Sequence, residues 1–195
     1  GTWKSVNTSV ATVSTTGIVS GASAGTDKIW YIVTNGSGCT DSRDVDVTVN
    51  ALPIVSITGN QAICVGKTNQ LTGTPGNGTW KSVNTSVATI NSTGLVTGAS
   101  AGTAKIWYIV TNGSGCTDSI DVDVTVNALP VINVTGNTTV CLNETSQLTG
   151  NPIGGRWKSL NTSIVTVDAN GLVTGVNAGN ATIRYIVTNS SGCVD

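Results

Sequence analysis

An internal repeat runs through the whole sequence and constrains the fold more than any other feature. Equivalent tryptophans and cysteines recur with a period of 77, namely Trp3, Trp80 and Trp157, and Cys39, Cys116 and Cys193. Residues 1–53 and 78–130 differ at only seven of 53 aligned positions. A period of this length predicts a tandem array in which the repeat unit, and not the whole chain, is what folds.

The two ends of the sequence do not coincide with the ends of the copies. We expect a partial copy at residues 1–50 that lacks its N-terminal strands, a complete copy at 51–127, and a copy at 128–195 that lacks its last strand. The sequence therefore looks like a window from a longer array. The links are short, because only Asn127, Ala128 and Leu129 separate the last valine of one copy from Pro130 of the next. With so little slack, the copies are expected to meet end to end in a semi-rigid rod.

Each copy is expected to be an all-β, antiparallel sandwich. Helix formers are scarce, since the chain has no Met and a single Glu, whereas Val, Thr and Ile are plentiful. Short apolar or alternating runs are separated by Gly, Asn and Ser turns, and NSTG between two such runs predicts a hairpin. The expected extended segments of the complete copy are 53–57, 62–73, 78–82, 87–90, 95–98, 104–111 and 120–126.

Several functional classes are disfavoured by composition. A net charge of −1 provides no electrostatic footprint for nucleic acid. No apolar run is long enough for membrane insertion as a helix. The sequence has no histidine, so the usual serine or cysteine triads are not possible, and the lone Glu144 has no carboxylate neighbour in the sequence. We therefore expect no catalytic residues, no metal and no cofactor, and a protein that is not an enzyme.

The cysteines predict disulfides and an oxidising location. Two copies of the repeat each contain two cysteines 52 positions apart. This spacing favours the pairs Cys64–Cys116 and Cys141–Cys193, because each copy would then be closed by its own disulfide. A rival pairing, Cys39–Cys64 and Cys116–Cys141, would instead join neighbouring copies. In the favoured scheme the partner of Cys39 would lie before Gly1. Persisting disulfides indicate the periplasm, the cell surface or the medium.

Trp30 and Trp107 are candidate surface-binding residues. In the run AKIWYIVT, Ile106 and Tyr108 share one face, and Lys105 and Trp107 share the other. The third copy has Arg184 in place of Trp107. A position that accepts both Trp and Arg is expected to lie on the outer face of the sheet. A tryptophan there either covers a cross-strand neighbour, which we favour, or offers a platform for a sugar or a partner.

Acidic pairs occur on the last strand of two copies. Asp44 with Asp46, and Asp121 with Asp123, alternate with valines and should point outward. Calcium takes six to eight oxygen ligands, more than two carboxylates on a flat strand provide. We therefore interpret these pairs as a solvated strand edge that resists aggregation.

The run SVATINSTGLVTGASAGTAKIWYIV resembles the signature of bacterial Ig-like domains of group 2, and it recurs at residues 9–33, 86–110 and 163–187. The paired cysteines and the Gly-Cys step at Cys116 are similar to variants in long repetitive bacterial surface adhesins. The resemblance implies an immunoglobulin-like sandwich, in which Trp80 would pack in the core against the disulfide between the sheets.

The expected function is mechanical. The resemblance implies a stalk or adhesive module of a large secreted or cell-surface bacterial protein, with neighbouring repeats as its partners. An alternative is a module that binds surface glycans, other cells or another partner through Trp30 and Trp107. A further alternative is a spacer in a secreted enzyme or a phage tail protein, because a fold alone does not fix function. The sequence does not specify a ligand.

Overall fold

The computed structural model describes residues 1–195, which form twenty short strands and no helix. The all-β class is thus confirmed. The chain divides into two compact units, and the middle copy of the repeat contributes to both. The first unit contains Gly1–Thr58, Thr72–Trp80 and Trp107–Asp121, and the second contains Gly59–Leu71, Lys81–Ile106 and Val122–Asp195.

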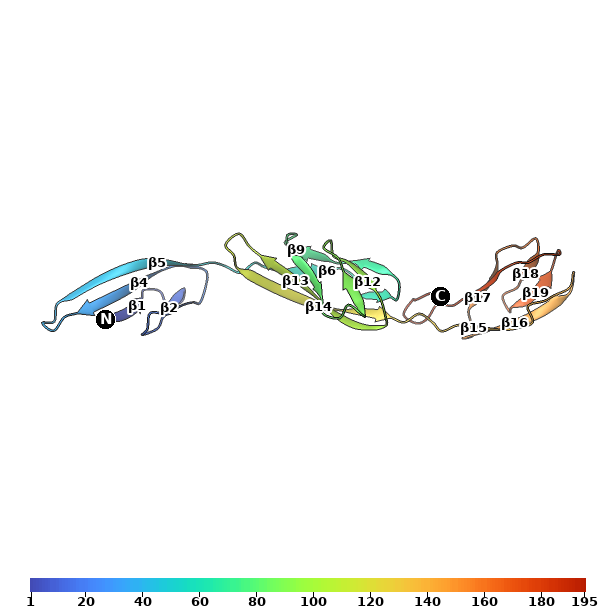
Figure 1. The fold of residues 1–195 in the computed structure, drawn as a ribbon, viewed down its shortest axis with the longest axis horizontal. Coiled ribbons are helices and arrows are strands. Elements are labelled where there is room, and N and C mark those ends of the chain that lie inside the picture. Colours follow the sequence, from blue (N-terminus) through green and yellow to red (C-terminus); the bar gives the residue numbers. More distant parts are fainter. The chain divides into compact units, whose positions relative to one another are not determined.

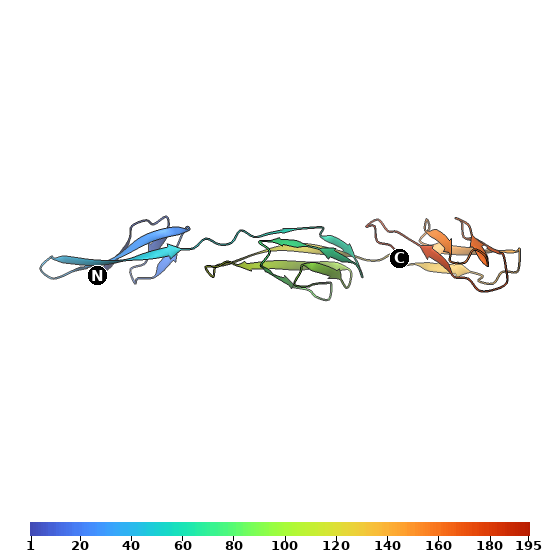
Figure 2. The same cartoon turned by 90° about the horizontal axis from the view of Figure 1, so that it is seen from above.

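The first copy is built on one long hairpin. β4 (Gly25–Thr34) and β5 (Thr40–Val49) pair antiparallel over their full length. β1 (Thr2–Ser5) adds to the other edge of β4, which gives the sheet order β1-β4-β5 (Figure 1). Figure 2 shows the same hairpin from above as a long ribbon. The separate pair of β2 and β3 comprises Ala11–Val13 and Val19–Gly21.

The middle copy has the most strands, and it contains one parallel pair. A four-stranded sheet has the order β10-β13-β14-β7. β14 pairs with β13 on one side and runs parallel to β7 on the other, with Asn127 opposite Cys64. A second sheet has the order β11-β12-β8, and β6 pairs with β9. The bounds are Ser56–Thr58 for β6, Ala62–Cys64 for β7, Thr68–Gln70 for β8, Thr72–Thr74 for β9, Thr79–Ser82 for β10, Ala88–Ile90 for β11, Leu95–Gly98 for β12, Gly102–Thr111 for β13 and Thr117–Asn127 for β14.

The third copy repeats this plan with fewer strands. Its sheets have the orders β15-β16-β19-β18 and β17-β20. Residues 139–141, which correspond to β7, are not a strand here, because the sequence that corresponds to most of β14 is not part of this chain. The bounds are Asn133–Gly136 for β15, Thr145–Asn151 for β16, Arg156–Ser159 for β17, Val165–Val167 for β18, Leu172–Gly175 for β19 and Ile183–Ile186 for β20.

Strand alternation places the core as the sequence predicts. Along β13, Ile106, Tyr108 and Val110 are buried, whereas Lys105 is exposed and Trp107 is half-buried. Along β14, Val124 and Val126 are buried and Asp123 is exposed. The NSTG hairpin is also confirmed, since β11 and β12 pair antiparallel across it.

The repeated tryptophans stack on tyrosines. Trp80 and Tyr108 have ring centroids 4.4 Å apart, and Trp3–Tyr31 and Trp157–Tyr185 repeat the contact at 4.6 and 4.5 Å. The expectation that Trp80 packs in the core against the disulfide of its own copy is wrong, because Cys116 is a free thiol and the half-buried ring meets a cross-strand tyrosine. Tilted aromatic pairs of this kind stabilise a fold beyond the apolar area that they bury.

Each of two tyrosines fixes the loop before its partner tryptophan. The Tyr108 hydroxyl donates to the carbonyl oxygen of Pro75 and accepts from the N–H of Gly78 at 2.8 Å. Tyr185 does the same with Pro152 and Gly155. A Cβ added at Gly73 or Gly150 would collide with the tyrosine ring, so only glycine allows the strand to pass this closely.

Candidate functional site

The disulfide of this chain joins Cys64 to Cys193, which are 129 residues apart. Because this separation exceeds one period of the repeat, the bond crosses from one copy into the next, wherever the boundary is drawn. Cys116 and Cys141 are free thiols, as is Cys39. The favoured pairing Cys64–Cys116 and Cys141–Cys193 is therefore wrong for this structure, and so is the rival pairing.

The position of Cys193 explains the pairing. Asn127, at the end of β14, lies opposite Cys64 in the parallel pair with β7. The Cys193 sulfur lies 3.9 Å from the carbonyl oxygen of Asn127. The end of β14 is thus next to both cysteines, and Cys193 is completely buried there.

A tight turn holds Cys193 against the link between copies. The Asn189 side chain accepts hydrogen bonds from the N–H groups of Ser191 and Cys193, at 3.1 and 2.9 Å. Its Nδ2 donates to the carbonyl oxygen of Ala128 at 2.8 Å. We call this set of contacts the linker clasp: an asparagine that closes the turn before a cysteine and also binds the link between two copies.

The linker clasp occurs at the previous link as well. Asn112 accepts from the N–H of Cys116 at 3.0 Å and donates to the carbonyl oxygen of Ala51 at 2.8 Å. The Cys116 sulfur lies 3.9 Å from the carbonyl oxygen of Asn50. The two links therefore have the same hydrogen bonds and the same place for a cysteine, although only the second has a bonded partner.

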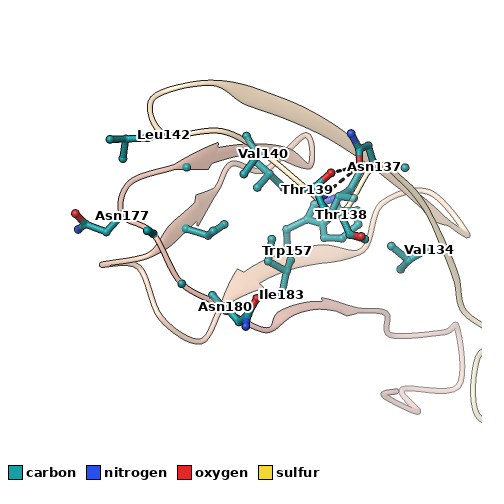
Figure 3. Close-up of a pocket in the computed structure, with 18 of the residues that line it drawn as sticks. Val134, Asn137, Thr138, Thr139, Val140, Leu142, Trp157, Asn177, Asn180 and Ile183 are labelled. Atoms are coloured by element: carbon teal, nitrogen blue, oxygen red, sulfur yellow. Dashed lines mark hydrogen bonds between the residues drawn. The ribbon is translucent and has the colours of Figure 1, made fainter.

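A pocket of about 490 Å³ opens in the third copy (Figure 3). Trp157, Val173 and Ile183 belong to its lining, and the hydrogen-bonded Asn137–Thr139 turn forms part of the wall. In the middle copy the buried Val124 and Val126 of β14 cover the core. The third copy lacks their counterparts, so we assign the pocket to the uncovered core of a sandwich rather than to a ligand site.

Trp30 and Trp107 are both half-buried. Trp30 lies between two cross-strand neighbours, Lys4 on β1 and Asp44 on β5. In the third copy Arg184 takes the corresponding place opposite Lys158. The aromatic pairs of the structure involve Trp3, Trp80 and Trp157, and neither Trp30 nor Trp107 is part of one.

The acidic pairs meet lysines from the neighbouring strand. Lys28 forms ion pairs with Asp44 and, at 3.1 Å, with Asp46. Its hydrogen bonds to Asp44 and then to Asp46 raise the pKa of the Lys28 ammonium above its usual value. In the middle copy Lys105 lies 3.4 Å from Asp123. Asp44, Asp46 and Asp123 thus each have a cation as partner. The chain has no cluster of three or more His, Cys, Asp or Glu side chains suited to a metal ion.

Asp27 is a buried charged residue that the sequence pattern did not reveal. It is 3% exposed and accepts hydrogen bonds from the Ser5 hydroxyl and the N–H groups of Asn7 and Lys28, at 2.7, 2.8 and 2.7 Å. Burial raises the pKa of this carboxyl, but these hydrogen bonds outweigh burial and the pKa lies below its usual value. The equivalent residues of the other copies are Ala104 and Ala181.

The family follows from the repeated sandwich. Residues 44–120 and 121–194 each match the bacterial Ig-like domain (group 2) family. The chain belongs to this family. Its group 2 Ig-like domains therefore occur in tandem, which confirms the resemblance noted in the sequence. Membership suggests a structural repeat module of a surface protein, without assigning it a specific role.

This Ig-like array is similar in sequence to a bacterial ice-binding protein. It is 29% identical over 210 residues to Ice-binding protein 1 of Shewanella frigidimarina (strain NCIMB 400), covering 97% of this chain and 23% of that protein. The chain thus spans less than a quarter of the length of this relative. No helix in the Ig-like array is both long enough and apolar enough to cross a bilayer.

Solved structures also resemble the array at low similarity. An intimin mutant of EHEC O157:H7 is 23% identical, with a TM-score of 0.29 over 44% of this chain and 51% of that chain. The S-layer protein rSbsC(31-844) is 17% identical, with a TM-score of 0.26 over 96% of this chain and 31% of that chain. These values are too low to bear on function.

Proposed function

We propose that the chain is a load-bearing segment of a large secreted or cell-surface bacterial protein, made of Ig-like copies at residues 1–50, 51–127 and 128–195. The observation that carries the proposal is the Cys64–Cys193 bond, because it joins residues more than one repeat apart. A bond within one copy would stabilise that copy alone. A bond that crosses the link between copies also resists their separation.

The consequence for tension is topological. When the chain is pulled at its two ends, the covalent path runs from Gly1 to Cys64, crosses the disulfide, and continues from Cys193 to Asp195. Residues 65–192 lie inside the loop, so they are shielded from extension even after they unfold. At about 3.4 Å per extended residue, the bond shortens the fully extended chain by about 440 Å.

The linker clasp supports the same role. Asn112 and Asn189 bind the links at Ala51 and Ala128 with the same geometry. Near-identical copies are what an element replicated for length requires, whereas a specific binding site usually depends on loops that differ. An oxidising, extracellular location is the environment in which such a disulfide persists.

Single-molecule stretching tests this function. The chain is tethered by its termini and pulled to full extension before and after reduction with a small dithiol. We expect the extended length to increase by about 440 Å on reduction. The variant Cys193→Ser should show the longer length in both conditions, and Cys39→Ser should behave as the unmodified chain. Equal lengths before and after reduction would reject the load-bearing role.

A second candidate function is binding through the outward tryptophans. The observation in its favour is that Trp30 and Trp107 keep part of their indole surface exposed on the outer face of a sheet. Tryptophan faces stack well on sugars and on partner side chains. A glycan array probed with the chain and with Trp107→Ala tests this candidate. Loss of a bound glycan in the variant would support it, and unchanged binding or no binding at all would remove it.

A further inference from the structure

The cysteines Cys116 and Cys141 are unbonded in this chain, yet each has the same local hydrogen bonds as a bonded cysteine. Cys116 is half-buried and Cys141 is exposed. Each corresponds, by the period of the repeat, to one end of the Cys64–Cys193 disulfide: Cys116 to Cys193, and Cys141 to Cys64. If a free cysteine has the same local contacts as its bonded equivalent, it is placed to form the same kind of disulfide.

Cys116 matches Cys193 in the hydrogen bond of its N–H group and in the place of its sulfur next to the link. The N–H group of each cysteine donates to the side-chain oxygen of an asparagine four residues earlier, at 3.0 and 2.9 Å. The sulfur of each lies 3.9 Å from the carbonyl oxygen of the asparagine that ends the preceding copy. The residues 44–50 and 121–127 that lead to these asparagines are identical in sequence, DVDVTVN. Cys116 is therefore held where Cys193 meets its partner.

Cys141 matches Cys64 in its backbone contacts. The carbonyl oxygen of Cys64 accepts from the N–H of Lys67 at 3.0 Å, and that of Cys141 accepts from Glu144 at 3.1 Å. The residue two positions after each cysteine donates to a glycine that ends the facing strand: Gly66 to Gly98, and Asn143 to Gly175, both at 2.8 Å. The two cysteines thus begin the same kind of turn, and equivalent strands, β12 and β19, face them.

We propose that Cys116 and Cys141 are cystine-forming sites whose partners are cysteines of further copies, at the same separation of 129 along the array as Cys64 and Cys193. Cys116 bonds to a cysteine that far before it, and Cys141 bonds to one that far after it. Cys39, which closes the same kind of turn with Asn35, is a third site of the first type. The proposal rests on the load-bearing function and extends it from one bond to a series of such bonds along the array. We call this series the ladder.

The chemistry of each bond is a dithiol oxidation. Two thiols lose two protons and two electrons and form one S–S bond, and a small-molecule disulfide such as oxidised glutathione accepts the electrons and is reduced to two thiols. Thiolate attack through a mixed disulfide is the ordinary route for this exchange. The exposed thiol of Cys141 is accessible to such an oxidant.

The ladder has a mechanical consequence that a single bond lacks. Each bond spans more than one period of the repeat, and a new bond begins in every copy, so successive bonds overlap along the sequence. The overlapping bonds form two parallel covalent paths along the array, which we call tracks. Each track crosses one bond and then 25 residues of chain, as from Cys116 to Cys141, before it reaches its next bond. Only this short stretch in every two periods can then lengthen under load, and its fully extended length is about 85 Å at roughly 3.4 Å per residue. The array becomes nearly inextensible even when its sandwiches unfold.

The test adds one copy to the full chain. Because Asp118 and Asp195 are equivalent, a repeat of residues 119–195 placed after Asp195 keeps the register and supplies the missing partner of Cys141. The extended protein is oxidised with glutathione disulfide, alkylated, digested with trypsin and analysed by mass spectrometry without reduction. We expect residues 106–156, which contain Cys141, to be linked to the last tryptic peptide of the added copy, and alkylation of Cys141 to fall to near background.

The controls separate this proposal from the load-bearing function. In the extended protein, Cys141→Ser should leave Cys64–Cys193 intact and free only the last cysteine of the added copy. If Cys141 stays alkylated or bonds to Cys193 while the fold is retained by circular dichroism, the ladder is rejected. If Cys64–Cys193 forms without a Cys141 bond, the load-bearing function stands and the ladder alone fails. If neither bond forms, both fail.

Discussion

Asn127 lies opposite Cys64 in the parallel pair of β14 and β7, and its carbonyl oxygen is 3.9 Å from the sulfur of Cys193. One residue at the end of one copy is thus adjacent to the cysteine of its own copy and to the cysteine of the next. This relationship gives the array a covalent connection at its links, where tandem domains otherwise depend on a few residues of chain. Four further properties of the chain follow from the contacts described.

Removal of the disulfide should lower stability. In the chain-entropy model, a bond that closes a loop of 129 residues stabilises the folded state by up to about 5 kcal/mol. We expect Cys193→Ser to lower the thermal midpoint of the second unit, as measured by calorimetry. Addition of reductant should lower the midpoint of the unmodified chain to the same value and leave the variant unchanged. A variant that remained sensitive to reductant would contradict the assignment of this bond.

The close passage at Tyr108 should make Gly73 intolerant of any side chain. A Cβ at Gly73 collides with the tyrosine ring, whereas a Cβ at Gly76 meets nothing within 4 Å. We expect Gly73→Ala to cost about 1 to 3 kcal/mol, as overpacking in a core does, and Gly76→Ala to be nearly neutral. Urea midpoints of the two variants provide the comparison. Equal midpoints would show that the ring moves aside without cost.

The outer-face position of Trp107 should accept arginine. Arg184 occupies the equivalent place in the third copy, so Trp107→Arg is expected to change the free energy of unfolding by no more than about 0.5 kcal/mol. Trp80→Ala, which removes the ring that stacks on Tyr108, should cost about 2 kcal/mol or more. Thermal midpoints distinguish the two. A larger loss for Trp107→Arg than for Trp80→Ala would reverse the assignment of faces.

The pH dependence of the first unit should contain a contribution from Asp27. Its pKa is lower in the folded state than in the unfolded state, so its charged form stabilises the fold above the unfolded value near 3.8. That stability is lost as the pH falls through the folded pKa. We expect Asp27→Ala, which copies Ala104, to flatten the loss of stability as the pH falls below the unfolded value, as measured by urea unfolding. An unchanged acid profile would show that Asp27 does not contribute.

Local patterns were enough to predict much of the fold. The alternation in β13 and β14 indicated the buried faces, and the NSTG turn indicated the β11–β12 hairpin, because both depend on residues close in sequence. The cysteine partners could not be predicted this way. Spacing alone leaves several pairings open, and the one found depends on the Asn189 turn folding back onto Ala128 of the preceding link.

Other parts of the candidate site also lacked a sequence signal. The collision that fixes Gly73 arises from Tyr108, which lies on a distant strand. Asp27 stands where the other copies have alanine, so no motif marked it as buried. One signal was present in the sequence, since an Asn stands four residues before each of Cys39, Cys116 and Cys193. Together with the short links at Ala51 and Ala128, this recurrence could have indicated the linker clasp.

Tryptic mapping of the unreduced chain tests most directly whether the cystine joins successive copies. Cys64 lies in residues 44–67, Cys193 in 185–195, and Cys116 and Cys141 together in 106–156. We predict one linked pair, 44–67 with 185–195, and an alkylated 106–156 peptide. A three-peptide product in which 106–156 is bonded to both of the others would mean that Cys64 and Cys193 are bonded to Cys116 and Cys141 and not to each other, and it would contradict the account.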